Sequence, residues 1–447
     1  MQLVGYFPMI RAIKGTRDIL PPETTLWDRV ESSAREILEL YSFSEIRTPI
    51  FEATELFARG VGVDTDIVLK EMYTFEDRDE KSLTLRPEGT APVVRSVIEN
   101  RLFQESGILK LYYLGPMFRR ERPQKGRYRQ FHQIGAEVLG SDNPAIEAEI
   151  LEMLLLFLER IGIGNHALLI NSIGCRECRP RYLERLKEEL NLKRDQLCGD
   201  CQRRATSNPL RVLDCKVEGC QPLIESLPVI TDFLGPECQQ PFEKFQSYLD
   251  QRGISYTRVP RLVRGLDYYT RTTFEITSQS LGAQNTLIGG GRYDGLSEAL
   301  GGGPLPGFGF ALGLERVLLV LQEAASSVPV LAPQLFLAPL GEVAFEQAAL
   351  LARDLRRRGV KCFLDFEPRS LKSAMRLANR LGAEFVLMLG EAELKSGMYP
   401  LKRMSSGEQR EVGLGEIYEW IAKAAETTPQ PVRSYGKREG DFGFGSA

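Results

Sequence analysis

Residues 109–140 read LKLYYLGPMFRRERPQKGRYRQFHQIGAEVLG, and the predicted architecture is built around them. Two apolar segments flank residues 119–129, which are so rich in Arg, Lys, Gln and Pro that they predict a solvated loop. The stretch is therefore expected to form two antiparallel strands that are joined by a long loop.

The second strand of this hairpin carries polar side chains suited to binding a ligand. Side chains alternate along a strand, so Phe131, Gln133, Gly135 and Glu137 would share one face, with Gly135 leaving an open slot between an amide and a carboxylate. Such a slot suits a small cationic ligand, because both oxygens accept hydrogen bonds from an ammonium group. The alternative is a polar strand face that meets only water. His132 would face the other way, as a packed core residue and not a base.

The rest of the chain predicts several further elements. The first is an amphipathic helix, whose apolar residues recur at helical spacing: Leu26, Val30, Ala34, Ile37, Leu38 and Tyr41. Residues 46–51 look extended, and Pro49 favours an edge or interface strand. Residues 175–250 have helical periodicity and read as an insertion, and strand-like patterns follow in residues 256–276.

The composition loosens at residues 324–333, which predicts a linker and a domain boundary near residue 325. The region beyond it reads as a small α/β domain. Its expected strands cover residues 334–340, 360–364 and 384–389, and its expected helices cover residues 343–358 and 369–381. Residues 427–447 combine Pro, Gly, Ser and charge without periodicity, so we expect a disordered tail.

Composition narrows the class of protein. A chain of 447 residues, 43% of them hydrophobic, predicts two or three domains. The formal net charge of -3 gives no overall attraction to nucleic acid, so any RNA contact would come from local basic stretches. No apolar run approaches the roughly 20 residues of a membrane helix, and the N-terminal residues lack a signal-peptide pattern. The sequence therefore predicts a cytoplasmic protein.

Arginines form the candidate phosphate-binding groups. Arg119 and Arg127, around the hairpin loop, are planar donors suited to phosphate oxygens, although Arg-rich loops are usually only solvated. Arg264 and Asp267 stand among apolar and aromatic residues, so they are either a structural salt bridge or a pair that is used in chemistry. Arg316 falls in the first turns of a predicted helix, where the helix dipole already favours anions.

Glycine-rich phosphate loops are not a convincing alternative. Residues 289–295 read GGGRYDG and look like a turn that allows close approach of a ligand, which is a weak signal alone. The sequence has no Walker motif and no convincing dinucleotide-binding fingerprint, so phosphate binding would rest on arginine side chains.

Seven of the eight cysteines lie in the insertion. Two C-x-x-C pairs, Cys175 with Cys178 and Cys198 with Cys201, have a spacing that fits a four-thiolate structural zinc site. Cys215 and Cys220 are substitute ligands, and reduced thiols without metal are an equal alternative. His166 has no flanking motif and is expected to be structural.

Four motifs together resemble class II histidyl-tRNA synthetases, in order from about residue 13 to residue 321. They are LRPEGT at 85–90, the hairpin segment 118–133, LVRGLDYY at 262–269 and GFGFALGLER at 307–316. The hairpin and the last segment are similar to class motifs 2 and 3. RGLDYY and GGRYDG, at 264–269 and 290–295, look like the two histidine-specific signatures.

The resemblance implies an α+β fold: an antiparallel sheet flanked by helices that carries the active site, a helical insertion and a C-terminal α/β anticodon-binding domain. The implied division is an N-terminal lead (1–12), a catalytic domain (13–325, with residues 175–250 inserted), the anticodon-binding domain (326–426) and the tail (427–447). It also implies a homodimer that forms around Pro49.

The resemblance further implies a histidine-tRNA ligase that uses ATP and Mg²⁺ to make histidyl-adenylate and then charges tRNA(His). Arg264 and Arg119 would be the catalytic residues, with Arg264 acting on the α-phosphate, and Arg119, Arg127 and Arg316 would bind ATP. Histidine would be bound by Glu88, Thr90, Gln133, Glu137, Tyr268, Tyr269 and Tyr293. Arg127 and its neighbours would also meet the RNA acceptor end, and basic residues at 353–361 and 369–380 would face the anticodon.

Two rival classes share some of these features. A catalytically inactive paralogue that regulates histidine biosynthesis has the same fold, but such proteins tend to lose the ATP-binding arginines and the C-terminal domain. A protein that only binds RNA would have no reason to keep Glu88, Gln133, Glu137 and Arg264 together.

Overall fold

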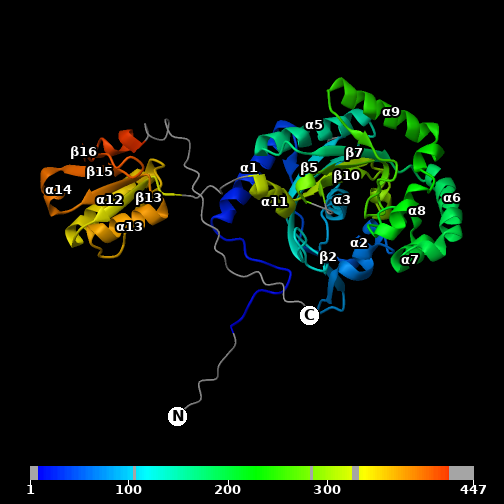
Figure 1. Cartoon of the computed structure of the whole chain (residues 1–447), viewed down its shortest axis with the longest axis horizontal. Helices are drawn as coiled ribbons and strands as arrows, with labels where there is room; N and C mark the ends of the chain where they lie inside the picture. The colour runs from blue at the N-terminus through cyan, green and yellow to red at the C-terminus, as the bar shows by residue number, and fades with distance from the viewer. Residues whose placement is uncertain (1–8, 104–106, 282–284, 325–331, 422–447) are drawn as a thin grey trace, which may run out of the picture. The chain divides into compact units, whose positions relative to one another are not determined.

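The computed structural model describes residues 9–103, 107–281, 285–324 and 332–421 (Figure 1). The chain divides into two compact units, and each is described here by itself. Of the described residues, one unit holds residues 9–18 and 27–324, and the other holds residues 332–421 with residues 19–26. The predicted tail, most of the predicted linker and the first eight residues of the lead lie outside the described residues.

An eight-stranded sheet forms the centre of the first unit. Its neighbours are antiparallel except for the parallel outer pairs β1–β5 and β7–β8. In spatial order the strands are β1 (Ser44–Glu45), β5 (Leu109–Phe118), β6 (Gln130–Leu139), β11 (Gly307–Gly313), β10 (Thr286–Arg292), β9 (Thr270–Thr277), β7 (Ala167–Ser172) and β8 (Thr257–Arg258). The predicted antiparallel sheet is confirmed.

The β5–β6 hairpin pairs along its whole length, from Phe118 opposite Gln130 to Leu109 opposite Leu139. The loop between the strands is joined to residues 14 and 15, because the Arg129 backbone N–H donates to the Gly15 carbonyl at 2.7 Å. The Arg129 side chain also donates to the Lys14 carbonyl at 3.1 Å. The start of the predicted catalytic domain therefore fixes one side of the loop.

Helices cover the sheet, and their ends follow local sequence chemistry. Helix α5 (Pro144–Ile161) begins where the Asn143 side chain accepts from the Ala145 N–H, and it ends at Gly162 in the left-handed conformation. Other helices that pack on the two faces of the sheet are α1 (Glu23–Leu40), α3 (Thr90–Glu99), α9 (Pro236–Gln251) and α11 (Leu314–Ala324). Among the described residues, no helix is both long enough and apolar enough to cross a membrane.

A small three-stranded sheet holds part of the region where an interface strand was predicted. It has the order β2 (Phe51–Ala53), β4 (Ser82–Leu85), β3 (Tyr73–Glu76), and helix α2 (Thr54–Val61) follows β2. Pro49 lies in the connection between β1 and β2 and not in a strand, because proline cannot donate to a ladder. The neighbouring apolar side chains Ile50, Phe51 and Phe75 are exposed.

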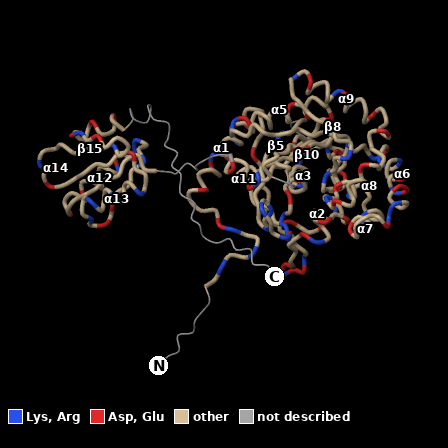
Figure 2. Tube along the Cα trace, in the orientation of Figure 1, with Lys and Arg blue, Asp and Glu red and all other residues tan. Residues whose placement is uncertain are grey.

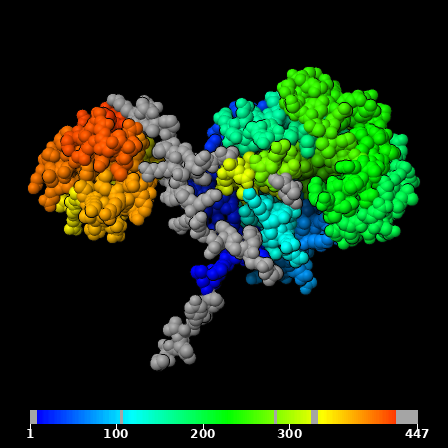
Figure 3. Space-filling model, in the orientation of Figure 1, coloured from blue at the N-terminus to red at the C-terminus, as the bar shows by residue number. Residues whose placement is uncertain are grey.

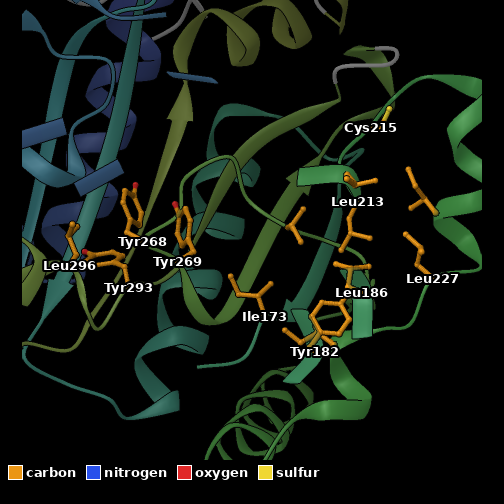
Figure 4. Packing of buried hydrophobic residues seen from close by; sticks show 14 of the residues in the cluster. Ile173, Tyr182, Leu186, Leu213, Cys215, Leu227, Tyr268, Tyr269, Tyr293 and Leu296 are labelled. Carbon is orange, nitrogen blue, oxygen red and sulfur yellow. The ribbon is translucent and has the colours of Figure 1, made fainter. Parts of the chain in front are cut away.

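The insertion is helical, as predicted, and forms one side of the unit (green in Figure 3). Its helices are α6 (Cys178–Leu192), α7 (Gly199–Ser207), α8 (Gln221–Glu225) and α9. One buried cluster joins the insertion to the catalytic sheet: it runs from Tyr268, Tyr269 and Tyr293 to Tyr182 and Leu186 (Figure 4). The insertion and the sheet thus share a hydrophobic core.

The second unit is an α/β domain with a five-stranded sheet, and its predicted strands and helices are present. The strand order is β13 (Cys362–Leu364), β12 (Leu335–Pro339), β14 (Phe385–Leu389), β15 (Met398–Arg403), β16 (Gln409–Gly413). Its helices are α12 (Glu342–Arg357), α13 (Leu371–Leu381) and α14 (Glu391–Ser396). The β15–β16 pair and α14 were not predicted.

Candidate active site

A cavity of about 180 Å³ lies against strands β6, β10 and β11 of the first unit. It is lined by residues that are far apart in the sequence, which the antiparallel sheet brings together. Nine of the predicted site residues line it: Glu88, Thr90, Arg119, Arg127, Gln133, Arg264, Tyr268, Tyr269 and Arg316.

Glu137 and Tyr293, the two other predicted residues, lie behind this lining. Glu137 is fully buried, its Oε1 accepts from Thr90 Oγ1 at 2.7 Å, and its Oε2 accepts from the Tyr293 hydroxyl. Burial raises the pKa of Glu137 to about 8, and the hydrogen bonds from Tyr293 and Thr90 oppose this rise. The carboxyl group therefore reaches the cavity only through Thr90.

The predicted open slot at Gly135 is wrong, because the ring of Tyr113 fills it. Tyr113 pairs with Gly135 across the hairpin, and a Cβ at position 135 would clash with the Tyr113 ring. The Tyr113 hydroxyl is buried without a hydrogen-bond partner among the described residues, and Tyr113 lines the cavity. A bulky residue opposite a strand glycine was the sequence signal that could have identified it.

Glu88 has both a structural and a ligand-facing role. Its two oxygens accept from the Thr90 and Ala91 backbone N–H groups at 2.7 and 2.9 Å, so it caps the start of α3. Burial raises the pKa of Glu88, and these backbone hydrogen bonds oppose the rise. Because a carboxylate has about four acceptor sites, Glu88 can still accept from a ligand ammonium.

Gln133 supplies a second acceptor for the same ligand. Its Oε1 is buried and has no hydrogen-bond partner among the described residues. An unpaired buried carbonyl costs about 1–3 kcal/mol, so a ligand N–H placed there would gain that energy back. Gln133 and Glu88 both line the cavity, which suits an ammonium group between them.

Arg264 is held over strand β10 by a partner that the sequence did not identify. Its guanidinium forms an ion pair with Glu275 on β9, and it lies 5.9 Å from the centre of the Tyr269 ring. Its Nε is buried without a partner among the described residues. Asp267 is not its partner, since Asp267 accepts from Asn208 at 3.0 Å in the insertion. The Nε N–H of Arg264 thus has no protein acceptor among the described residues.

The predicted glycine-rich turn is wrong in its first half, because Gly289–Arg292 belong to strand β10. The glycines serve close approach within the sheet. A Cβ at position 289 would stand 2.5 Å from Arg264 Nη1, so Gly289 makes room for that guanidinium. The two histidine-specific signatures meet nearby, where the rings of Tyr268 and Tyr293 pack edge to face with their centres 5.7 Å apart.

Arg119, Arg127 and Arg316 converge at the other end of the cavity. Arg119 Nε donates to the Pro87 carbonyl at 2.9 Å, and Arg316 Nη1 donates to the Thr286 carbonyl at 2.9 Å. Burial and the nearby Arg127 lower the pKa of Arg316, so an anion between these arginines would be stabilised. Charged residues of both signs are interleaved along the chain trace (Figure 2), and here Arg127 forms an ion pair with Glu121 at 3.1 Å.

A second cavity of about 670 Å³ adjoins the first and reaches the insertion. The two cavities share the walls formed by Arg119, Glu121, Arg127, Arg264, Thr286 and Arg316. Glu71 and Glu121 also line the second cavity, and burial followed by the charge of Glu121 raises the pKa of Glu71. These two carboxylates are oxygen ligands of the kind that Mg²⁺ takes beside phosphates.

The cysteines do not form the four-thiolate set that the two C-x-x-C pairs predicted. Cys198 and Cys201 gather with Cys215 and Cys220, whereas Cys175 and Cys178 gather with Cys238. The two C-x-x-C pairs belong to different parts of the helical insertion, and the turns between α7 and α8 bring Cys215 and Cys220 to the second pair.

Neither histidine lines the cavity. The His132 ring packs edge-on against Trp27 at 4.9 Å, and its Nδ1 lies 3.0 Å from Glu315 Oε1. It is half-buried and not fully in the core, because it sits on the α1 side of the sheet. The His166 ring Nδ1 lies 3.3 Å from the Ile163 carbonyl, next to the end of α5.

Comparisons with known proteins identify the family of the chain. A family model described as histidyl-tRNA synthetase matches residues 15–197 and 225–317, and one described as an anticodon binding domain matches residues 334–424. The chain is 56% identical to a histidine–tRNA ligase of Solibacter usitatus, over 92% of this chain and 98% of the relative. It is 50% identical to the same ligase of Geobacter sulfurreducens, over 91% and 98%.

Solved structures show the same relationship. The crystal structure of apo histidyl-tRNA synthetase from S. aureus has a TM-score of 0.78 and 39% identity, and it covers 92% of this chain and 100% of that one. A Bacillus halodurans structure described as an ATP phosphoribosyltransferase regulatory subunit/histidyl-tRNA synthetase has a TM-score of 0.60 and 22% identity, which shows the fold alone. By family model, sequence identity over nearly its whole length and fold, the chain belongs to the histidyl-tRNA synthetases.

Proposed function

We propose that this chain activates L-histidine with ATP to histidyl-adenylate and then transfers the histidyl group to the 3′ end of tRNA(His). The observation that carries the proposal is one continuous cavity wall. At one end it offers acceptors for an ammonium group, Glu88 and Gln133, and at the other it offers the arginines Arg264 and Arg316. Membership of the histidyl-tRNA synthetases supports the choice of histidine and its transfer RNA as substrates.

Histidine would bind in the smaller cavity. Its volume of about 180 Å³ is below the roughly 300 Å³ at which typical ligand pockets begin, so it suits an amino acid and not a nucleotide. Glu88, Gln133 and Thr90 would hold the α-ammonium end. Tyr268 and Tyr269 would border the imidazole, with Glu137 and Tyr293 orienting Thr90 from behind.

ATP would extend into the larger cavity of about 670 Å³. Arg119, Arg127 and Arg316 would bind its phosphates as planar donors. A carboxylate oxygen of histidine attacks the α-phosphorus, and the bond from this phosphorus to the bridging oxygen breaks, so pyrophosphate leaves with the electron pair. Arg264 would stabilise the charge that develops on the α-phosphate oxygens.

Magnesium would shield phosphate charge during this step. Glu71 and Glu121 are the residues that would hold it, because both line the nucleotide end of the cavity and neither is committed to a buried helix cap. In the second step a hydroxyl of the terminal ribose attacks the activated carbonyl carbon, and AMP leaves. Arg127 and its loop would contact the RNA acceptor end.

The second unit would bind the anticodon, as the match of residues 334–424 suggests. We also propose a homodimer in the cytoplasm. Ile50, Phe51 and Phe75 are exposed on and beside the three-stranded sheet. Apolar side chains that are exposed close together often mark a protein–protein interface, so these three support an interface there.

Histidine-dependent ATP–pyrophosphate exchange tests the proposal. Purified protein with Mg²⁺ is assayed with each of the twenty amino acids, and the variants Arg264→Ala and Arg185→Ala are compared. Exchange with histidine alone, lost in Arg264→Ala and kept in Arg185→Ala on the exposed face of α6, is expected. An absence of exchange with every amino acid would favour the regulatory paralogue.

A further inference from the structure

We propose that Cys198, Cys201, Cys215 and Cys220 bind one structural zinc ion in the helical insertion. The four sulfur atoms all lie within 4.8 Å of one another, although Cys198 and Cys220 are 22 residues apart in the chain. This site lies in residues 198–224, which the two matched ranges of the synthetase family model leave out.

The spacing of the sulfurs matches a zinc tetrahedron and not a disulfide. Zn–S bonds of about 2.3 Å place the sulfurs of a tetrahedral site about 3.8 Å apart. Cys198 Sγ and Cys215 Sγ are 3.8 Å apart. A disulfide needs sulfurs about 2.0 Å apart, and all four cysteines are free.

The local backbone is arranged for thiolates. The Cys198 N–H donates to Cys220 Sγ at 3.3 Å, and the Val217 N–H donates to Cys215 Sγ at 3.4 Å. Such donors favour a negative sulfur. The C-x₂-C pair at Cys198 and the C-x₄-C pair at Cys215 both have the spacing of structural zinc ligands.

The chain between α6 and α9 has little regular secondary structure to stabilise it. Between α6 and α9 the chain forms only α7, the five-residue α8 and short 3₁₀ turns, with no strand among the described residues there. Cys198 and Cys201 lie at the start of α7, and Cys215 and Cys220 lie on the turns that lead to α8. A segment with so little regular secondary structure has few stabilising contacts of its own. A metal that joins these two points would stabilise it.

The alternative is a cluster of reduced thiols that packs as small apolar groups, since Cys201, Cys215 and Cys220 are buried. The second group, Cys175, Cys178 and Cys238, provides a comparison inside the same insertion. Among the described residues it has no fourth cysteine, histidine or carboxylate within the same distance. Structural zinc takes four protein ligands, so the proposal assigns the metal to the four-cysteine group alone.

Metal analysis of the full-length protein, purified without chelators, tests the assignment. We expect about one zinc ion per chain in the wild type. The zinc content of purified Cys201→Ser should be about tenfold lower. Cys238→Ser, an equally buried cysteine of the three-thiol group, is the matched control and should keep its zinc. Zinc that persists in Cys201→Ser, or that is lost only in Cys238→Ser, would overturn the proposal.

X-ray absorption at the zinc edge keeps the test independent of whether a variant folds. The wild type should show four sulfur neighbours at about 2.3 Å. The proposal would be contradicted by mixed nitrogen and oxygen neighbours around the zinc. It would also be contradicted if wild-type protein from zinc-supplemented cells contained no zinc, or if these cysteines formed disulfides in freshly purified protein.

Discussion

Gly289→Ala should disable the activation step by displacing the Arg264 guanidinium. The added Cβ would stand 2.5 Å from Arg264 Nη1, whereas ordinary contacts begin near 3.4 Å, so the guanidinium must move by about 1 Å. Displacement of a catalytic group by that distance costs about 100-fold in rate, or about 2.7 kcal/mol of transition-state stabilisation. We therefore expect histidine-dependent ATP–pyrophosphate exchange to fall by about 100-fold.

The matched control is Gly303→Ala. A Cβ at position 303 would meet no atom within 4 Å, and Gly303 has no left-handed backbone conformation. This variant should exchange like the wild type, and both variants should unfold near the wild-type temperature. Combining Gly289→Ala with Arg264→Ala should cost little more than Arg264→Ala alone, because both act through one guanidinium. Exchange by Gly289→Ala within threefold of wild type would refute the reasoning.

Three further predictions concern stability and assembly. Burial holds the pKa of Glu137 at about 8 in the folded protein against an ordinary value of 4.5, so the folded state keeps a proton that the unfolded chain releases. The wild-type free energy of unfolding should therefore fall as pH rises from about 5 to 8, and urea unfolding of Glu137→Gln should lack this part of the slope. Glu147→Gln breaks the buried pair of Glu147 with Arg292, whose atoms lie 2.7 Å apart, and should lower the free energy of unfolding by about 3–5 kcal/mol in the same urea assay; a loss below 1 kcal/mol would contradict this. Phe51→Glu places a charge on the proposed interface, so sedimentation should show monomers where the exposed control Arg185→Glu still forms dimers.

Much of the fold could be predicted because its signals are local. The β5–β6 hairpin has two long apolar runs around a loop of charged residues, and the structure places the strands where these runs lie. The helices of the second unit likewise follow their apolar periodicity. The short strands of the three-stranded sheet were harder, since two to four residues carry no period.

The site residues came from motifs, and what the motifs missed was pairing across the sheet. Tyr113 filling the space at Gly135 depends on the register of two strands, and Glu275 reaching Arg264 depends on the fold of the segment between them. The predicted grouping of the cysteines was wrong because it also depended on contacts between residues distant in the sequence. Spacing along the chain favoured joining the two C-x-x-C pairs, but the turns after α7 bring Cys215 and Cys220 to Cys198 instead.

Glu88 caps the start of the α3 helix with both carboxylate oxygens and also lines the cavity. Few single substitutions could therefore give resistance to an inhibitor that binds this carboxylate. Any substitution that removes the contact also leaves two helix N–H groups unpaired in the interior, at a cost of about 1–3 kcal/mol for each. Resistance at this position would have to be accompanied by a second change that rebuilds the helix start.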